Sequence, residues 1–379
     1  MHKYPLTLLV AVMLFLSGIA QTTAKEWYDK GISLKTNEDY KGAITAFKQA
    51  VSLKSDYVEA LHQLGWCYNE QDDYTSAVEA LLKEYNAGPA DKAANCFELG
   101  YAYEQLAKYD DALTYINSAI EADNNYALAY KERGMIYYKT KKYEAAIADF
   151  AKFEAASEED IDDPDYYFKK GWMQNEQKKY DDALKSLKKA VSLDDPPTDA
   201  FVELGYTNYK LKLNDDALKN YRIAMTLDAN NHTAIFGMAD VFYDNTKIDD
   251  SSIYYYQKGL QLKPGNKTAW YHIGWCYNNK DKFEDAINPL QKAIGLDANY
   301  LDAKKELAYS YYKLKRLDEA LAIFEPIMNN NSSDELSRYY AGFCYYLKNN
   351  QDSLKKMIAE LKALNSTRYV ETLTRYVKQ

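Results

Sequence analysis

The chain has 379 residues, and its 47 Lys and Arg against 56 Asp and Glu give a net charge of −9 at pH 7. A negative chain repels a phosphate backbone, and the lysines alternate with acidic residues without forming a basic stripe, which excludes nucleic acid as a partner. None of the four His lies in a metalloprotease or deaminase motif, and the sequence has no glycine-rich phosphate loop or nucleophile elbow. We therefore expect a protein that is not an enzyme and that binds no metal ion and no cofactor.

Residues 1–20 have the pattern of a secretory signal peptide. Lys3 supplies a basic start, Leu6–Leu16 is an apolar run with one threonine, and small residues follow. We prefer cleavage after Ala20, with cleavage after Ala24 as the alternative. The apolar run is shorter than the roughly 20 residues that a membrane span needs, so no stable membrane span is expected. The mature protein is predicted to be exported, either periplasmic or secreted.

Behind this segment, one pattern of residues returns along nearly the whole chain. In the clearest copy, Lys267–Tyr300, Gly274 lies in the first of two predicted helices, and Ala286 and Ala293 lie on one face of the second. Small residues at these positions let helices approach closely. One such hairpin cannot bury its apolar face alone, so the copies must stack. The glycine position recurs every 34 to 37 residues, at Gly31, Gly65, Gly100, Gly134, Gly171, Gly205, Ala239, Gly274, Ala308 and Gly342.

This spacing resembles the tetratricopeptide repeat, whose pattern is an aromatic residue, then Gly, then Tyr, then small residues in the second helix. The resemblance covers residues 24–365, with repeats that start near residues 24, 58, 93, 127, 164, 198, 232, 267, 301 and 335. It implies an all-α fold: an α-solenoid, wound as a right-handed superhelix, of about ten helical hairpins. Residues 366–379 are predicted to form an amphipathic C-terminal capping helix.

Four places depart from the regular pattern. The acidic run Ser157–Asp165 could offer carboxylates to calcium, but it lacks the Gly of a tight calcium loop, and we interpret it as a solvated connector and a mild hinge. Asp194–Pro197 is a second, stiff connector. Pro326 is expected to disturb the second helix of the ninth repeat. The tenth repeat has Leu354 where an Ala is expected, or Ser353 if one turn residue is missing.

A longer period lies above the short one. Repeats two, five and eight share a Trp directly after Gly, and the three Trp are 106 and 103 residues apart. We infer that a block of three repeats was copied three times behind a single first repeat. The simpler interpretation is a relic of duplication. The alternative is a surface that offers the same contact three times to an extended or repetitive partner.

The resemblance also implies a partner-binding surface. In arrays of this family the first helices line a concave groove, faced by the residues three before, one after and four after the Gly. Aromatic side chains supply much of the binding energy at such surfaces, and amides pair with an extended backbone. The predicted groove residues are Trp66, Asn69, Tyr101, Lys131, Phe168, Trp172, Asn175, Tyr206, Tyr271, Trp275, Asn278, Tyr309 and Phe343. The alternative is that these rings pack between neighbouring first helices. We favour exposure in the groove, because other positions already supply core residues.

One subset of the family binds C-terminal carboxylates through a Lys and an Asn of the groove. Lys131 and Lys305 match the Lys position, but Met135 and Tyr309 stand where Asn is needed. That carboxylate clamp is therefore absent.

The cysteines suggest packing and no metal site. Cys67, Cys276 and Cys344 share one repeat position, two residues after Gly, which favours small buried thiols over a Cys67–Cys96 disulfide. His272 and Cys276 are four residues apart on one predicted helix, but two ligands are too few for a structural zinc site.

Together these observations predict a non-enzymatic scaffold for protein–protein interactions in an exported compartment, with a partner peptide or protein bound in the aromatic groove. Family resemblance alone suggests assembly of an envelope complex as the setting. The alternative is a carbohydrate-binding module, in which the Trp and Tyr rings stack on the sugar rings of a glycan. The sequence carries no signal for the identity of the partner or for the oligomeric state.

Overall fold

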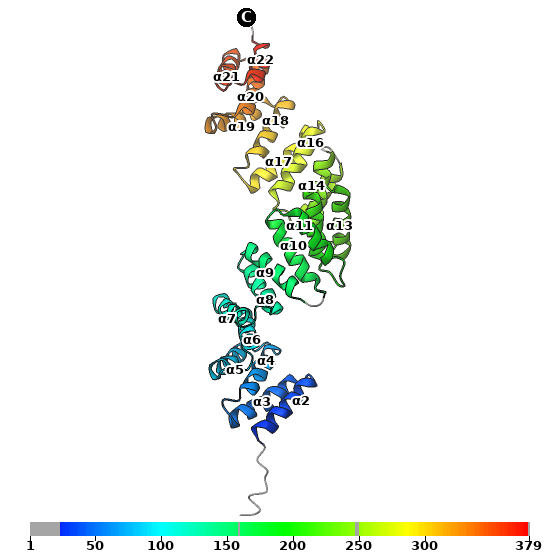
Figure 1. Cartoon of the computed structure of the whole chain (residues 1–379). Coiled ribbons are helices and arrows are strands. Elements are labelled where there is room, and N and C mark those ends of the chain that lie inside the picture. The colour runs from blue at the N-terminus through cyan, green and yellow to red at the C-terminus, as the bar shows by residue number, and fades with distance from the viewer. Residues whose placement is uncertain (1–22, 158–159, 247–249, 378–379) are drawn as a thin grey trace, which may run out of the picture. The chain divides into compact units, whose positions relative to one another are not determined.

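The computed structural model describes residues 23–157, 160–246 and 250–377, and over these ranges the chain forms 21 α-helices and no strand (Figure 1). The predicted all-α repeat architecture is confirmed. The predicted signal peptide, residues 1–20, and residues 158 and 159 of the acidic connector lie outside the described ranges. No helix in the described part of the chain is both long and apolar enough to cross a membrane.

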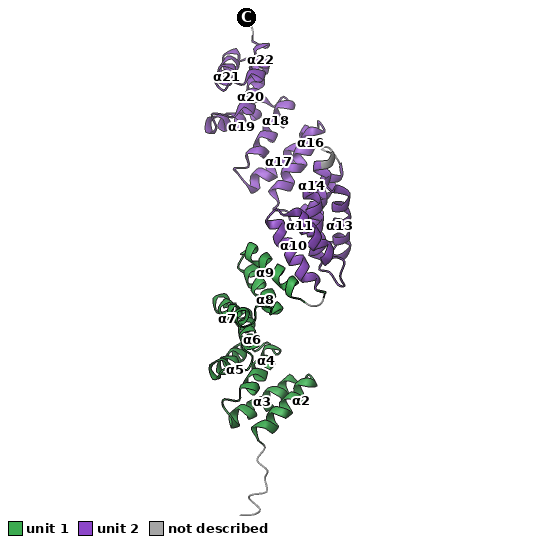
Figure 2. Cartoon of the chain, in the orientation of Figure 1, with its two compact units in different colours: residues 1–162 green, residues 163–379 purple. Residues whose placement is uncertain are grey.

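The chain divides into two compact units, residues 1–162 and 163–379 (Figure 2), and the division falls inside the acidic connector. The helices of the first unit are α2 (Ala24–Thr36), α3 (Tyr40–Leu53), α4 (Val58–Asn69), α5 (Tyr74–Ala87), α6 (Lys92–Gln105), α7 (Tyr109–Ala122), α8 (Ala127–Lys139) and α9 (Tyr143–Ala156). The helices of the second unit are α10 (Pro164–Glu176), α11 (Tyr180–Ala190), α12 (Thr198–Lys210), α13 (Asn214–Leu227), α14 (His232–Thr246), α15 (Asp250–Leu262), α16 (Lys267–Asn279), α17 (Phe283–Leu296), α18 (Leu301–Lys313), α19 (Leu317–Asn330), α20 (Glu335–Leu347), α21 (Gln351–Ala363) and α22 (Thr367–Thr374).

Each repeat is a hairpin of two packed helices, and in seven of the ten the repeated Gly lies directly against a side chain of the second helix. A Cβ added at Gly65 would lie 2.4 Å from Leu81 Cγ of the second helix, and one at Gly274 would lie 2.4 Å from Leu290 Cγ. Both distances are too short for any real side chain. The short-period pattern therefore reflects a steric requirement, as predicted from the small residues.

The two irregular repeats near the C-terminus keep the hairpin form. Helix α19 runs through Pro326 without a break, so the expected disturbance of this helix is wrong. In the tenth repeat, Leu354 takes the Ala position and is fully buried. Here a Cβ at Gly342 would meet Leu373 of α22 at 2.7 Å, because α22 packs directly on α20. The last helix therefore covers the end of the second unit, as a capping helix must.

A buried ion pair joins three helices of the first unit. The Arg133 guanidinium on α8 donates two hydrogen bonds of 2.7 Å to Asp149 on α9, and a third of 2.7 Å to the side-chain oxygen of Asn117 on α7. Asp149 is buried, so its carboxylate relies on this fork of donors.

The four cysteines are all buried and free, which confirms the prediction of free thiols. Burial raises the pKa of the Cys67 thiol to about 11 and that of Cys344 to about 12. At neutral pH these side chains are therefore protonated and act as small apolar residues.

Candidate partner-binding face

Neighbouring first helices meet through one recurring pair of residues. The residue four after the Gly position contacts the residue two before the Gly position of the next repeat, and we call these contacts ladder pairs. Three are hydrogen bonds between an Asn and a Glu, one joins Lys to Gln, and two are contacts between aromatic rings. The ladder pairs are Lys35–Gln63, Asn69–Glu98, Asn175–Glu203, Tyr243–His272, Asn278–Glu306 and Tyr312–Tyr340.

The three asparagines that were predicted to face the groove are members of the ladder pairs. Asn69, Asn175 and Asn278 are only 4%, 4% and 5% exposed. Their side-chain amides donate to the carboxylates of the following repeats at 2.7, 2.9 and 2.8 Å. They therefore tie repeats two to three, five to six and eight to nine. This corrects the expectation that these amides are free to pair with a partner's backbone.

Two of these three pairs are completed by a hydroxyl. Thr207 donates to Asn175 Oδ1 at 2.9 Å, and Ser310 donates to Asn278 Oδ1 at 2.7 Å. In the first copy Ala102 takes the corresponding position, and Asn69 Oδ1 has no hydrogen-bond partner among the described residues. The first copy of the motif therefore buries an unpaired acceptor that the other two copies satisfy.

One ladder position holds two acids. Between repeats three and four the corresponding residues are Glu104 and Glu132. Lys139 forms an ion pair with Glu104, whereas Glu132 Oε1 lacks a hydrogen-bond partner within the described ranges. Burial, and then the nearby Glu104 charge, raise the pKa of Glu132 to about 7, although Lys139 and Lys131 oppose the shift. This pair is the weakest electrostatic match of the ladder.

The predicted aromatic stripe is only partly free. Trp66, Tyr101, Tyr206 and Tyr309 each place a ring edge-on against the first residue of the preceding repeat's second helix. The ring pairs are Tyr40–Trp66, Tyr74–Tyr101, Tyr180–Tyr206 and Phe283–Tyr309, with centroids 5.7, 6.1, 6.5 and 6.0 Å apart. Such edge-to-face pairs stabilise the stack. Each ring still keeps part of its surface exposed, Tyr206 most at 36%.

The remaining predicted residues differ in their surroundings. Phe343 lies against the ring of Tyr376 at 5.4 Å, so the C-terminal segment covers part of it. Phe168 packs against the apolar cluster of the fifth and sixth repeats. Tyr271, Trp172 and Lys131 are partly buried. The Lys131 ammonium lies 5.7 Å from the ring centre of Phe153.

Two cavities flank α16 on the face formed by the first helices of the second unit. The smaller, of about 220 Å³, brings together three predicted residues, Trp275, Asn278 and Tyr309, with Lys305 and Tyr340. The larger, of about 490 Å³, lies between α12, α14 and α16 and includes predicted Tyr206. We call the surface around these cavities the α16 face.

Most of the larger cavity consists of residues that the sequence analysis did not select. Its polar lining includes Asp240, Asp244 and His272. The cavity also contains Lys210 and Lys263, and its rings include those of Tyr209 and Tyr243. A signal was present: Asp240 stands where seven other repeats place Trp, Tyr or Phe after the Gly position, and Gly237 stands at the ladder position. The repeat therefore lacks two large side chains on this face, and a hollow results.

A hydrogen-bonded chain holds the polar side of this cavity. The buried Tyr256 hydroxyl donates to Asp240 Oδ1 at 2.5 Å and lies 2.7 Å from His272 Nδ1. Burial lowers the pKa of His272 to about 4 and raises that of Asp240 to about 6. At neutral pH His272 is therefore uncharged, and Asp240 is mainly a carboxylate that the imidazole does not neutralise.

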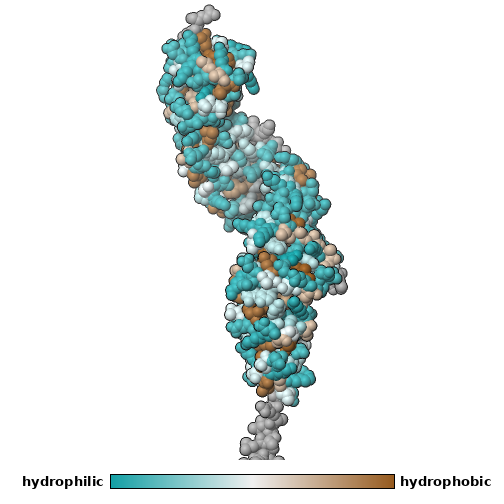
Figure 3. All heavy atoms as spheres, turned by 60° about the vertical axis from the view of Figure 1, so that its left-hand side comes forward, coloured by the Kyte–Doolittle hydropathy of each residue, from teal (hydrophilic) through white to brown (hydrophobic). Residues whose placement is uncertain are grey.

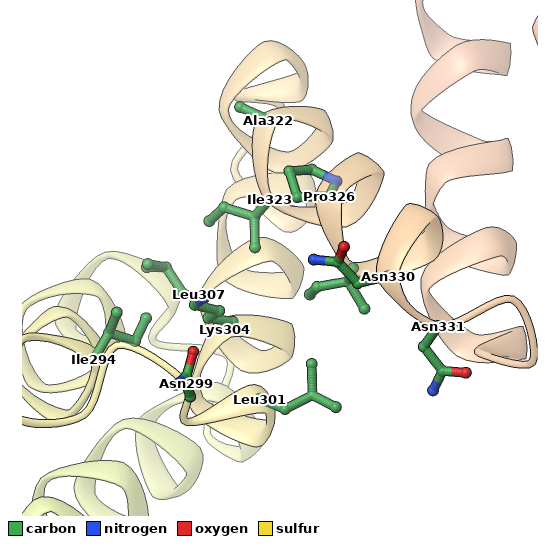
Figure 4. Close-up of a pocket in the computed structure, with 11 residues that line it drawn as sticks. Ile294, Asn299, Leu301, Lys304, Leu307, Ala322, Ile323, Pro326, Asn330 and Asn331 are labelled. Atoms are coloured by element: carbon green, nitrogen blue, oxygen red, sulfur yellow. The ribbon is translucent and has the colours of Figure 1, made fainter.

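A third cavity, of about 420 Å³, is mainly apolar and is lined by none of the thirteen predicted residues. Figure 4 shows Ile294 near Leu307, with Leu301 farther away on α18 and with Ala322 and Pro326 on the neighbouring α19. Pro326 has no N–H to offer to the Ala322 carbonyl, and the helix continues through this position. Elsewhere the surface in view is mostly hydrophilic, with scattered apolar residues (Figure 3).

These observations define an α-solenoid repeat protein whose first helices carry a hollowed, aromatic face. Models described as tetratricopeptide repeat match residues 28–92, 97–161 and 164–196, and one described as anaphase-promoting complex, cyclosome, subunit 3 matches residues 245–327. The chain belongs to the tetratricopeptide repeat family.

Known proteins resemble the chain only in part. A probable UDP-N-acetylglucosamine–peptide N-acetylglucosaminyltransferase SPINDLY of Hordeum vulgare is 28% identical over 32% of this chain and 14% of its own length. Neutrophil cytosol factor 2 of Homo sapiens is 32% identical over 27% of this chain and 17% of its own length. The solved structure of Pseudomonas aeruginosa pilF, 19% identical, covers 57% of this chain and 97% of its own, with a TM-score of 0.45. The chain thus spans less than a fifth of the length of these two relatives.

Proposed function

We propose that this protein is a non-enzymatic scaffold that binds a peptide segment of another protein on the α16 face. The observation that carries the proposal is the pair of cavities on either side of α16, one of which collects Trp275, Asn278 and Tyr309. Partly exposed rings beside polar groups are the surface that an extended peptide uses for its anchors. The pattern of residues 1–20 supports an exported setting, periplasmic or secreted, where the scaffold assists the assembly of an envelope complex.

The buried asparagines change where the contact is expected. The side-chain amides of Asn69, Asn175 and Asn278 donate to a carboxylate of the neighbouring repeat, so the peptide backbone must pair with other groups. Asn279 lines the smaller cavity and is exposed. Its amide donates to the Trp275 carbonyl at 2.8 Å, and its Oδ1 can accept from a peptide N–H. Binding is therefore assigned to the second unit, and the threefold duplication is assigned to construction of the stack.

The test is crosslinking of the exported protein in cells, followed by affinity capture and mass spectrometry. The variant Trp275→Ala with Tyr309→Ala removes two rings from the smaller cavity. The control is Tyr254→Ala, which removes a 59% exposed ring from the second helix α15. Circular dichroism checks that each variant is folded.

We expect a partner that is captured by the wild type and by the control, and lost from the double variant. Capture that persists in the folded double variant would overturn the α16 face as the site. Elution of the partner by a soluble oligosaccharide, with no effect of unlabelled peptide, would replace the peptide proposal with glycan binding.

A further inference from the structure

The larger cavity of the α16 face combines acidic groups with several tyrosine rings. Its lining includes the carboxylates of Asp240 and Asp244 and the rings of Tyr206, Tyr209 and Tyr243. The hydrogen bond on Asp240 among the described residues reaches Oδ1 from Tyr256, which leaves Oδ2 without a donor. A carboxylate flanked by aromatic faces is the environment in which a cation is bound most strongly.

A second observation points to a missing ligand. The Tyr221 side chain on α13 lines the same cavity and is 2% exposed. In the described part of the chain its hydroxyl has no hydrogen-bond partner. Its ring end reaches the backbone at Gly237, where an added Cβ would lie 2.7 Å from the hydroxyl oxygen. A hydroxyl that faces a cavity of about 490 Å³ and has no protein partner in the described ranges is a group that a bound molecule can satisfy.

The chain's own lysines show that this surface attracts cations. The Lys210 ammonium lies 5.1 and 5.2 Å from the ring centres of Tyr206 and Tyr209 at the cavity. Lys212 lies 3.9 Å from Asp244. Lys210 is exposed, so an incoming cation can displace it. In the described ranges no lysine or arginine forms an ion pair with Asp240, and His272, 4.0 Å away, is uncharged at neutral pH.

We propose that this cavity receives an arginine side chain of the partner segment. The planar guanidinium can stack against Tyr206 or Tyr243 while its N–H groups donate to Asp240 Oδ2 and to the Tyr221 hydroxyl oxygen. A lysine ammonium lacks the flat face and the fork of donors, so it fits less well. This inference rests on the proposed peptide scaffold and names the side chain that anchors the peptide.

The test uses the full-length protein and a probe of known composition. The probe is a capped pentapeptide of glycine and alanine with one central arginine, and its affinity is measured by isothermal titration calorimetry. The comparison peptide carries citrulline, which has the same shape without the charge. We expect the arginine peptide to bind at least about ten-fold more tightly, because hydrogen bonds to charged groups are worth about 1.5–3 kcal/mol.

Three variants locate the site. Asp240→Asn should weaken the arginine peptide at least about ten-fold. Asp302→Asn makes the same change at an exposed acid of α18 outside the cavity and should leave the affinity unchanged. Lys210→Ala should strengthen binding by about two- to five-fold, because it removes a competing cation worth about 0.5–1 kcal/mol at exposed rings. This gain cannot arise from misfolding.

Equal affinity for the arginine and citrulline peptides, or full affinity in Asp240→Asn, would overturn the assignment. The outcome of the cellular capture experiment is independent of the outcome of the peptide titration. A partner that depends on Trp275 and Tyr309, with no binding of the arginine peptide, would keep the scaffold and reject the arginine. An Asp240-dependent arginine site, with a partner indifferent to the double variant, would keep the specificity of the larger cavity and reject the smaller cavity as the partner's site.

Discussion

Replacing Ala102 by Ser should stabilise the second and third repeats. Ala102 is fully buried on α6, at the position where Thr207 and Ser310 donate to an Asn of the preceding repeat. Without a hydroxyl there, Asn69 Oδ1 remains unpaired. Satisfying a buried acceptor is worth about 1–3 kcal/mol, and Ser in place of Ala in a helix costs about 0.5 kcal/mol. We therefore expect a net gain of about 1 kcal/mol.

The assay is native-state hydrogen exchange read by mass spectrometry, because a stack of repeats need not unfold in one step. A gain of about 1 kcal/mol slows exchange about five-fold in α4 and α6. The mirror variant Ser310→Ala should accelerate exchange in α16 and α18 by a similar factor. The control Ser118→Ala removes a hydroxyl that bonds only the Thr114 carbonyl of its own helix, at 3.0 Å.

Unchanged exchange in both Ala102→Ser and Ser310→Ala would refute the reasoning, since the hydroxyl would then contribute nothing to the interface. Faster exchange in Ala102→Ser alone would mean that the buried position has no room for an oxygen. In that case packing would outweigh the hydrogen bond.

Three further predictions concern groups buried elsewhere. Glu132→Gln should stabilise the protein by up to about 3 kcal/mol at pH 8. The folded pKa of Glu132, about 7, lies above the unfolded value near 4.3, so this side chain destabilises the folded protein only where its carboxylate is ionised. In urea unfolding, the increase in the free energy of unfolding should therefore be about 2 kcal/mol smaller at pH 5 than at pH 8. Arg133→Ala should cost about 3–5 kcal/mol in the same assay, because it leaves Asp149 buried without its partner. Arg316→Ala breaks an exposed pair and should change the free energy of unfolding far less. The four buried thiols should resist an aromatic disulfide reagent at pH 8 in the native protein and all react in denaturant; rapid native labelling would contradict their burial.

The repeat architecture could be predicted from the sequence because it depends on local steric demands. Gly65 and Gly274 recur in register since a second helix must pass within contact distance of each. The same logic located each hairpin, including the tenth, where Leu354 replaces the small residue. The prediction at Pro326 was wrong because a helix packed on both sides can tolerate one missing hydrogen bond.

The candidate site was only partly predictable, because it depends on how one first helix is offset from the next. Asn278 looked like a groove residue by its place in the repeat, and only the offset shows that it meets Glu306. The larger cavity depends on Tyr221, a second-helix ring that extends beneath Gly237. The sequence shows Asp240 as an exception in an aromatic series, but not that a hollow surrounds it.

The ladder pairs have a consequence for how such a chain changes length over time. The junctions between repeats two and three, five and six, and eight and nine use the same Asn and Glu, so a crossover between duplicated blocks joins Asn69 to Glu203 or Asn175 to Glu306. The new junction then contains the same donor and acceptor as the old ones. Blocks of about a hundred residues can thus be gained or lost by recombination, and the new junction still has a complete Asn–Glu ladder pair. The irregular seventh repeat lies between two such junctions. Recombination at these junctions can therefore transfer the block that carries it, with its acidic cavity, to a stack of different length.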